Sequence, residues 1–222
     1  VIFTNESDSE GSHHPFMVIM SYGATEGLTG LWDVPRPPGS GEVGTSYSEQ
    51  TVTRNANLGA IFAKIPMKDY GLTESLTENV MISDLASDVS ESNLTVLNYA
   101  SISATGIAID GVLIYPAYNN TLEYASLPGE ISNVGIHSGR GLGLHYHADA
   151  HGANSNGLNI YNDSDYTNYA HPPIISFGFD GIAGYARYAV GDSLSEGVEI
   201  DFDQWGGHNH DAYRYHYHAE QI

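Results

Sequence analysis

The chain has 222 residues, of which 41% are hydrophobic, so it can bury a core as one large β domain or two small ones. Asp and Glu total 27 against 7 Lys and Arg, which gives a formal net charge of -20. A surface of this sign repels nucleic-acid phosphates and anionic lipids, which argues against nucleic acid and membranes as partners, and it attracts cations.

The first 41 residues are predicted to be an N-terminal arm and linker. Residues 1–14 are polar and acidic apart from an apolar tip at Val1–Phe3. The apolar run Phe16–Met20 predicts a buried strand. Pro35–Gly41 (PRPPGSG) predicts a stiff linker, because proline donates no hydrogen bond to a sheet.

Residues 42–103 are predicted to form a β-sandwich-like module. Thr51–Thr53, Ala60–Ile65 and Leu94–Leu97 have the composition of strands. Leu72–Val89 stays open between two interpretations. Its apolar residues have helical spacing, whereas its frequent Ser, Thr and Asp favour loops.

Two predicted hairpins follow, and they share one pattern. In each, an apolar segment leads to Asp-Gly and then to a second apolar segment that contains a Tyr. Asp-Gly between two such segments is a strong hairpin signal, so the chain is predicted to be mainly β. The hairpins are Ser101–Ile109 with Val112–Tyr115 around Asp110-Gly111, and Ile174–Phe179 with Ile182–Tyr188 around Asp180-Gly181.

The hairpins belong to an internal repeat within residues 104–222. The hairpin segments match at an offset of 70, and the His-Tyr-His-Ala-acid segments that follow match at an offset of 71. A lone histidine precedes each His-Tyr-His by 8 residues. We interpret this as a duplicated module, the alternative being a repeated structural hairpin without chemistry. The matching parts are Ile109–Tyr115 with Phe179–Tyr185, His145–Asp149 with His216–Glu220, and His137 with His208.

The histidine spacing predicts a metal site. His-Tyr-His on a strand places both imidazoles on one face, because side chains alternate. A third imidazole from the lone histidine completes a site for copper or zinc, and a three-histidine zinc keeps one position open. The alternative is a structural network of His and Tyr hydrogen bonds. The candidate ligands are His137, His145, His147, His208, His210, His216 and His218.

Four other residues are candidates to support this site. His151 and His171 flank the central loop and could join it. Asp149 and Glu220 are candidate outer acceptors that orient a histidine. Direct ligation by either carboxylate is disfavoured relative to this outer role.

Weaker signals lie elsewhere. Asn162–Asp165 offers oxygen ligands that suit calcium, but no EF-hand glutamate follows, so a solvated turn is the alternative. Gly139–Gly143 lacks the Lys-Ser/Thr of a P-loop, and no Gly-x-Ser-x-Gly motif of serine hydrolases occurs. His13 and His14 are expected to be solvated in the arm.

Several features favour a location outside the cell. The chain begins at Val1 without a basic and apolar leader, which we interpret as a mature chain after removal of a signal peptide. The absence of cysteine excludes disulfides and thiolate metal sites but leaves the redox compartment open. Four glycosylation sequons occur, each expected in an exposed turn, at Asn5, Asn93, Asn119 and Asn162.

A family resemblance rests on four segments: Tyr213–Glu220 (YRYHYHAE), Gly206–Asp211 (GGHNHD), Phe177–Tyr188 and Leu144–Asp149. Through these segments, residues 104–222 resemble the YHYH-domain family. Where many relatives have a cysteine before Gly-His, this chain has Trp205-Gly206-Gly207, so any role of that cysteine is absent. The resemblance implies a secreted protein with a histidine site, in a family without a firmly assigned reaction, and it leaves the first 103 residues unexplained.

Two classes of function are compatible with these features. The first is a secreted non-catalytic structural protein, a cell-surface or fibre subunit with a metal-stiffened core. The second is a copper- or zinc-dependent extracellular metalloenzyme, for which Asp149, Asp211 and Glu220 are the acid–base candidates.

The N-terminal arm adds a prediction of self-association. Phe16–Met20 can extend an open sheet edge of a neighbouring copy, and such head-to-tail donation makes filaments. The alternative is that Phe16–Met20 is the first strand of its own sheet.

Overall fold

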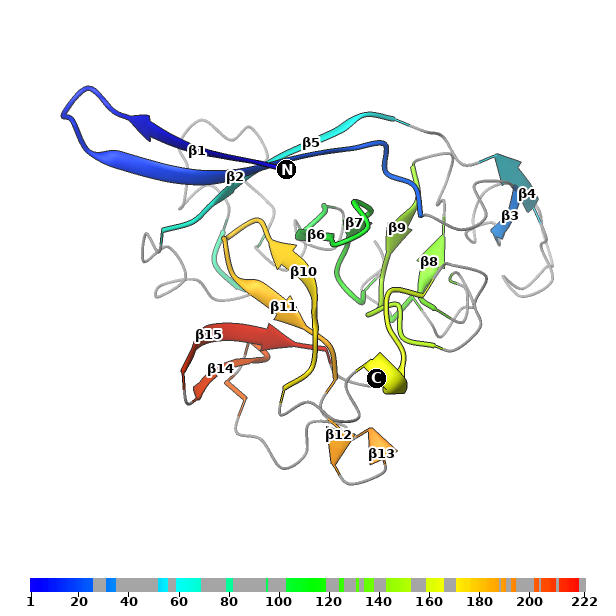
Figure 1. Ribbon diagram of the computed structural model, residues 1–222. Coiled ribbons are helices and arrows are strands. Elements are labelled where there is room, and N and C mark those ends of the chain that lie inside the picture. The colour runs from blue at the N-terminus through cyan, green and yellow to red at the C-terminus, as the bar shows by residue number, and fades with distance from the viewer. Residues whose placement is uncertain are drawn as a thin grey trace.

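The structure is a computed structural model, drawn as a ribbon in Figure 1. For residues 31–34, 52–55, 163, 189–190 and 193–194, only the backbone is described. The described residues are 1–25, 31–34, 52–55, 59–68, 79–81, 95, 103–118, 124–125, 131, 134–137, 143–152, 159–165, 171–187, 189–190, 193–194, 202–203, 205–210 and 212–219.

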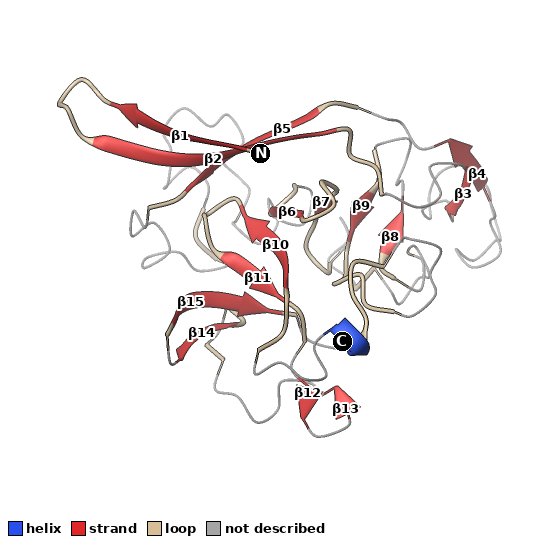
Figure 2. Cartoon of the chain, viewed as in Figure 1, coloured by secondary structure: helices blue, strands red, loops and turns tan. Residues whose placement is uncertain are grey.

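The described residues form a mainly β architecture, as the sequence predicts (Figure 2). One sheet has eight strands in mixed directions, one has three antiparallel strands, and two small sheets have two strands each. The helical turn η3 (Asp163–Asp165) is the one helical element among the described residues, and no helix there could span a membrane. The large sheets contain β1 (Ile2–Ser7), β2 (His13–Ser21), β5 (Ile61–Pro66), β6 (Gly106–Ala108), β7 (Leu113–Ile114), β8 (Ile136–His137), β9 (His145–Tyr146), β10 (Ile174–Gly178), β11 (Ala183–Tyr185), β14 (Gly207–His210) and β15 (Tyr213–His218), and the small sheets pair β3 (Leu31–Val34) with β4 (Val52–Asn55) and β12 (Ala189–Val190) with β13 (Ser193–Leu194).

The eight-stranded sheet consists of two four-stranded halves. Its order is β14-β15-β11-β10-β6-β7-β9-β8, so corresponding strands of the two repeats lie at equal steps from opposite edges. Their directions also agree, because β7–β9 and β11–β15 are parallel whereas the hairpin and edge pairs are antiparallel. The two halves are therefore related by a pseudo-twofold axis.

This axis passes between β6 and β10, the antiparallel pair at the centre of the sheet. Ile107 of β6 pairs with Phe177 of β10, which is its own counterpart at the offset of 70. Ile107 is fully buried, and Phe177 packs against the same cluster. The repeat in the sequence thus corresponds to a symmetric join in the sheet.

The three-stranded sheet packs on the eight-stranded sheet at this join. Met17 of β2 and Ala63 and Ile65 of β5 form a buried cluster with Ile107, and Phe177 lies against it. The cluster therefore combines side chains from all three segments into which the sequence was divided, and the boundaries at 41 and 103 stay predictions.

Both Asp-Gly turns lie against the ends of the three-stranded sheet. Gly111 and Gly181 have φ angles of 87° and 92°, in the left-handed region that glycine adopts without strain. A Cβ on Gly111 would collide with the Ser21 side chain, and one on Gly181 with the Pro66 carbonyl. The turns require glycine for conformation and for contact.

The aspartate of each turn binds the tyrosine of the His-Tyr-His segment. The Tyr146 hydroxyl donates to Asp110 and the Tyr217 hydroxyl to Asp180, each at 2.8 Å. Burial, and then the neighbouring carboxylate, raise the pKa of both phenols, so they remain protonated donors. Because the tyrosines point to this side, alternation places the histidines on the other face of β9 and β15.

The N-terminal segment is a hairpin, not the polar arm that its composition suggests. Residues 2–7 form β1, which pairs with β2 from Ile2↔Val18 to Ser7↔His13. The hairpin extends away from the body of the molecule in Figure 1, and its tip is a turn in which Asp8 accepts backbone amide hydrogen bonds. β2 also pairs with β5, so in this structure the strand predicted at Phe16–Met20 lies in a sheet of its own chain.

Some sequence predictions lie outside the described residues. Within the predicted segments Leu72–Val89 and Leu94–Leu97, Met81 and Thr95 are described and form an isolated β-bridge. The predictions outside are the Pro35–Gly41 linker, most of Leu72–Val89 and Leu94–Leu97, the sequons at Asn93 and Asn119, and the residues Asp211 and Glu220.

Candidate metal centres

The first centre consists of His137, His145 and His147, all buried. Its geometry follows from the β8–β9 pairing, in which His137 lies directly opposite His145. The His137 Nε2 atom lies 2.8 Å from His145 Nε2 and 3.1 Å from His147 Nε2. Three ring nitrogens therefore converge on one point, as the 8-and-2 spacing predicts.

Backbone carbonyls fix the orientation of two of these rings. His145 donates its Nδ1–H to the Gly143 carbonyl at 3.0 Å, and His147 donates to the Pro116 carbonyl at 2.6 Å. Since a carbonyl only accepts, the proton of each neutral ring is on Nδ1 and the lone pair is on Nε2. This is the arrangement that metal-binding histidines typically show.

The electrostatics of the first centre favour a bound cation. His137 Nε2 faces the Nε2 lone pairs of both His145 and His147. It can donate one hydrogen to only one of them, so the other contact brings two lone pairs together unless a ring is protonated. Protonation is disfavoured, because burial lowers the pKa of His145 to about 4, with a smaller effect of the charge on His147. At neutral pH the centre is an electron-rich group of nitrogens.

The nitrogen spacing is close to what a metal ion needs. A tetrahedral ion with metal–nitrogen bonds of about 2.0–2.1 Å holds its nitrogens about 3.3 Å apart. The observed separations of 2.8 and 3.1 Å need only to widen slightly. Small ring rotations would achieve this without movement of the strands.

The second centre consists of four histidines whose ligand atoms also lie within 4.8 Å of one another. His216 and His218 come from β15 and His210 from β14, whereas His171 precedes β10. The Nε2 atoms of His171 and His216 are 3.2 Å apart. The members are His171, His210, His216 and His218.

Carbonyl anchors recur in the second centre at the corresponding positions. His216 donates its Nδ1–H to the Arg214 carbonyl at 2.6 Å, and His218 donates to the Ala186 carbonyl at 2.9 Å. Arg214 corresponds to Gly143, and Ala186 to Pro116, at the repeat offsets. His171 has an anchor of its own, the Pro172 carbonyl at 2.9 Å. Three Nε2 lone pairs are thus directed away from the backbone.

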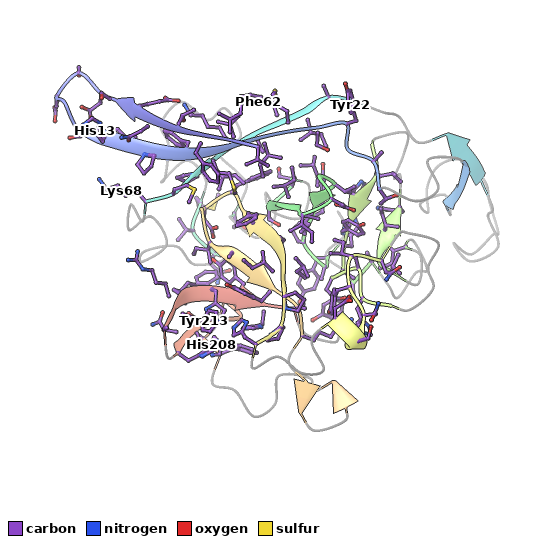
Figure 3. All side chains as sticks on the ribbon, in the orientation of Figure 1. His13, Tyr22, Phe62, Lys68, His208 and Tyr213 are labelled. Carbon is purple, nitrogen blue, oxygen red and sulfur yellow. The ribbon has the colours of Figure 1, made fainter. Side chains whose placement is uncertain are left out.

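His208 is the counterpart of His137, and it lies opposite His216 as His137 lies opposite His145, although the four-histidine group does not include it. Its ring centroid lies 4.9 Å from His216 and 4.7 Å from His210, beside the four-histidine group. A register irregularity between His208 and His210 lets both rings approach β15. Figure 3 labels His208 and Tyr213, which belong to the two strands of this hairpin.

Burial shifts the second centre toward neutral rings as well. It lowers the pKa of His218 to about 3 and also lowers the pKa values of His171, His208 and His216, because a low-dielectric surrounding penalises the charged form. Neutral imidazole is the form that binds metal ions.

A tyrosine ring packs on each centre at equivalent positions. Tyr115 lies 4.4 Å from His145 between ring centroids, and its counterpart Tyr185 lies 4.9 Å from His216 and 4.3 Å from His171. These rings restrict the rotation of the histidines. The sequence repeat marked both tyrosines only as strand ends.

The structure separates the two uncertain histidines. His171 joins the second centre, whereas His151 bridges to Tyr161, with ring centroids 5.1 Å apart, and belongs to neither group. Nothing in the repeat pattern marks His171, because its counterpart is Ser101. Its place before a predicted strand of the second repeat was the available signal.

Asp149 does not orient a histidine as the sequence suggested. Its carboxylate accepts two hydrogen bonds from Arg187, at 2.6 and 2.8 Å, and one from the Tyr161 hydroxyl. Asp149 and Arg187 are largely buried and belong to different repeats. Asp149 binds Arg187 and not a histidine ring because a charged guanidinium attracts a carboxylate more strongly than a neutral ring does. The ion pair therefore joins the two repeats.

The remaining predicted sites are described in part. Asn162 accepts a hydrogen bond from the Ser164 amide and Asp165 accepts one from the Asn162 amide, so these oxygens serve the turn, and no described metal-type group includes them. Asn5 is exposed but lies in β1, not in a turn. His14 lies 3.0 Å from the Asp8 carboxylate at the hairpin tip, and so is ordered there.

Comparison with known proteins gave no match to a protein-family model, a curated protein or a solved structure.

Proposed function

We propose that the chain is a metal-binding β protein whose two histidine centres hold copper or zinc. The observation that carries this proposal is the convergence of Nε2 atoms on rings whose Nδ1 atoms donate to backbone carbonyls. The geometry occurs twice, at corresponding residues. The acidic chain, with its net charge of -20, also raises the local concentration of cations.

The role that fits best is structural. An ion in the first centre ties β8 to β9, and an ion in the second ties β14 and β15 to the segment before β10. Because the unfolded chain lacks a preformed site, the binding free energy adds to folding stability. Such cross-links replace the disulfides that a chain without cysteine cannot form.

A non-catalytic role is also supported by the charges around the centres. Asp149, the described acid–base candidate, is occupied by Arg187 and Tyr161. No acidic residue belongs to either metal-type group in the described part of the chain. General acid–base catalysis needs such a group within hydrogen-bond reach of the substrate.

We further propose a secreted protein of the YHYH type that associates with copies of itself. The His-Tyr-His repeat and its glycine and tyrosine context support the first part, as a resemblance. Self-association is supported by exposed apolar side chains on and next to the three-stranded sheet, of which Figure 3 labels Tyr22 and Phe62. The exposed side chains are Ile2, Phe3, Met20, Tyr22 and Phe62.

A metal analysis of the protein purified without added metal tests the central proposal. The expected result is copper or zinc at up to two equivalents per chain. A chelator is expected to remove the metal and to lower the Tm. Protein that neither contains these metals nor takes them up after chelation and re-addition contradicts the proposal.

The alternative function, a metalloenzyme, is favoured by one observation: the first centre offers three imidazoles, the number found in zinc sites that keep a position for water or substrate.

A further inference from the structure

The two centres are unequal although the repeats that build them are alike. All 11 histidines of the chain lie among the described residues, so the imidazoles near each centre can be counted completely. The first centre has three, His137, His145 and His147. The second has four, whose ligand atoms lie within 4.8 Å of one another, and His208 lies beside them.

The extra imidazoles have no counterparts in the first repeat. His171 corresponds to Ser101 at the offset of 70, and His210 corresponds to Gly139 at the offset of 71. Serine and glycine at these positions supply no imidazole. The difference in the number of imidazoles therefore follows from the sequence and does not depend on small shifts of the rings.

From this count we infer that the centres differ in chemistry: the first keeps a coordination position open and binds a small anion directly on its metal, whereas imidazoles saturate the second. The inference rests on the proposed metal binding. A four-coordinate ion in the second centre receives four neutral nitrogens, and His208 is a fifth nearby. An ion held by three nitrogens takes a fourth ligand from solvent.

Charge and size indicate which ligand the first centre takes. Three neutral imidazoles leave the full charge of a divalent ion uncompensated, and this charge favours an anion. His137 and His147 each keep 7% of their surface exposed, and Tyr115 covers one side of the group. The ligand is therefore limited to a few atoms, such as hydroxide, azide or bicarbonate.

Cobalt(II) with azide as the probe tests this difference, since the visible spectrum of cobalt(II) reports its ligands. One variant removes the first centre, His145→Ala/His147→Ala, and one removes the second, His216→Ala/His218→Ala. Each is expected to bind one cobalt. Azide is expected to change the spectrum only where the first centre remains.

A third variant is the matched test within the second centre. His171→Ala/His210→Ala, made together with His145→Ala/His147→Ala, leaves His208, His216 and His218, the counterparts of the first centre's ligands. It is expected to gain the azide response that its parent lacks. Wild-type protein with two cobalt ions serves where a variant does not fold, and about half of its visible absorption is expected to respond.

The outcomes separate this inference from the proposal beneath it. Full-length protein that binds no cobalt, zinc or copper overturns both. Two bound cobalt ions that both respond to azide, or neither of which responds, overturn the inequality alone. A response confined to the second centre also overturns it.

Discussion

Ile107 pairs with Phe177 across the centre of the eight-stranded sheet, and each is the counterpart of the other in the repeat. The pair marks a pseudo-twofold axis, so every strand in one half has a partner at the same distance on the other side. The axis gives the molecule two equivalent histidine positions. The sequence around them then makes the positions unequal, through His171 and His210.

Acid is expected to destabilise the metal-free protein between about pH 6.5 and pH 4. The folded-state pKa values of His145 and His218 are about 4 and about 3, below the value of about 6.5 in an unfolded chain. The unfolded state therefore binds more protons in this window, and stability that is complete above pH 6.5 is lost as pH falls. Each histidine contributes a slope of about 1.4 kcal/mol per pH unit.

Urea unfolding with a chelator at pH 7 and pH 5 measures this effect. His145→Asn is the control, because an amide of similar shape does not titrate and the slope due to this residue disappears. An identical pH dependence in wild type and His145→Asn would show that the burial of His145 does not control the titration.

Loss of the Asp149–Arg187 pair is expected to lower stability and to leave metal affinity nearly unchanged. Asp149→Asn leaves Arg187 as a buried charge without its ionic partner, at a cost of about 3–5 kcal/mol. Because Asp149 binds Arg187 and not a histidine ring, zinc affinity at the first centre is expected to change less than threefold. A loss of about 10–100-fold in affinity, typical for residues that orient a ligand, would contradict this assignment.

Two glycine substitutions separate conformational strain from contact. Gly11 and Gly111 have similar φ angles of 83° and 87°, but a Cβ on Gly11 meets open space whereas one on Gly111 meets Ser21. Gly11→Ala is expected to cost about 1 kcal/mol, from the left-handed backbone alone. Gly111→Ala is expected to cost about 1–3 kcal/mol more, because the turn must move away from the three-stranded sheet. Equal effects in thermal unfolding would mean that the sheet does not pack tightly on this turn.

Much of the C-terminal half could be predicted from the sequence, for a physical reason. The Asp-Gly turns and the 8-and-2 histidine spacing are local patterns, and local patterns fix hairpins and the face on which a side chain lies. His137 and His145 thus meet as cross-strand neighbours. The repeat then doubled the evidence for each element.

The features that were missed depend on contacts between distant segments. Arg187 binds the carboxylate of Asp149 from 38 residues away. The sequence named His151 and His171 as equal candidates and did not show that His171 is the one that joins the second centre. Neither contact leaves a periodic signal. β1 was missed because its acidic and polar residues hide its alternation, although its pairing with β2 needs only the backbone.

The most direct test of the two-centre account is a calorimetric titration of the metal-free chain with zinc. The account predicts two equivalents for the full chain and one for each of His145→Ala/His147→Ala and His216→Ala/His218→Ala, with His151→Ala, a histidine outside both centres, still binding two. A stoichiometry that stays the same when either histidine pair is removed, or the absence of binding in the full chain, would contradict it.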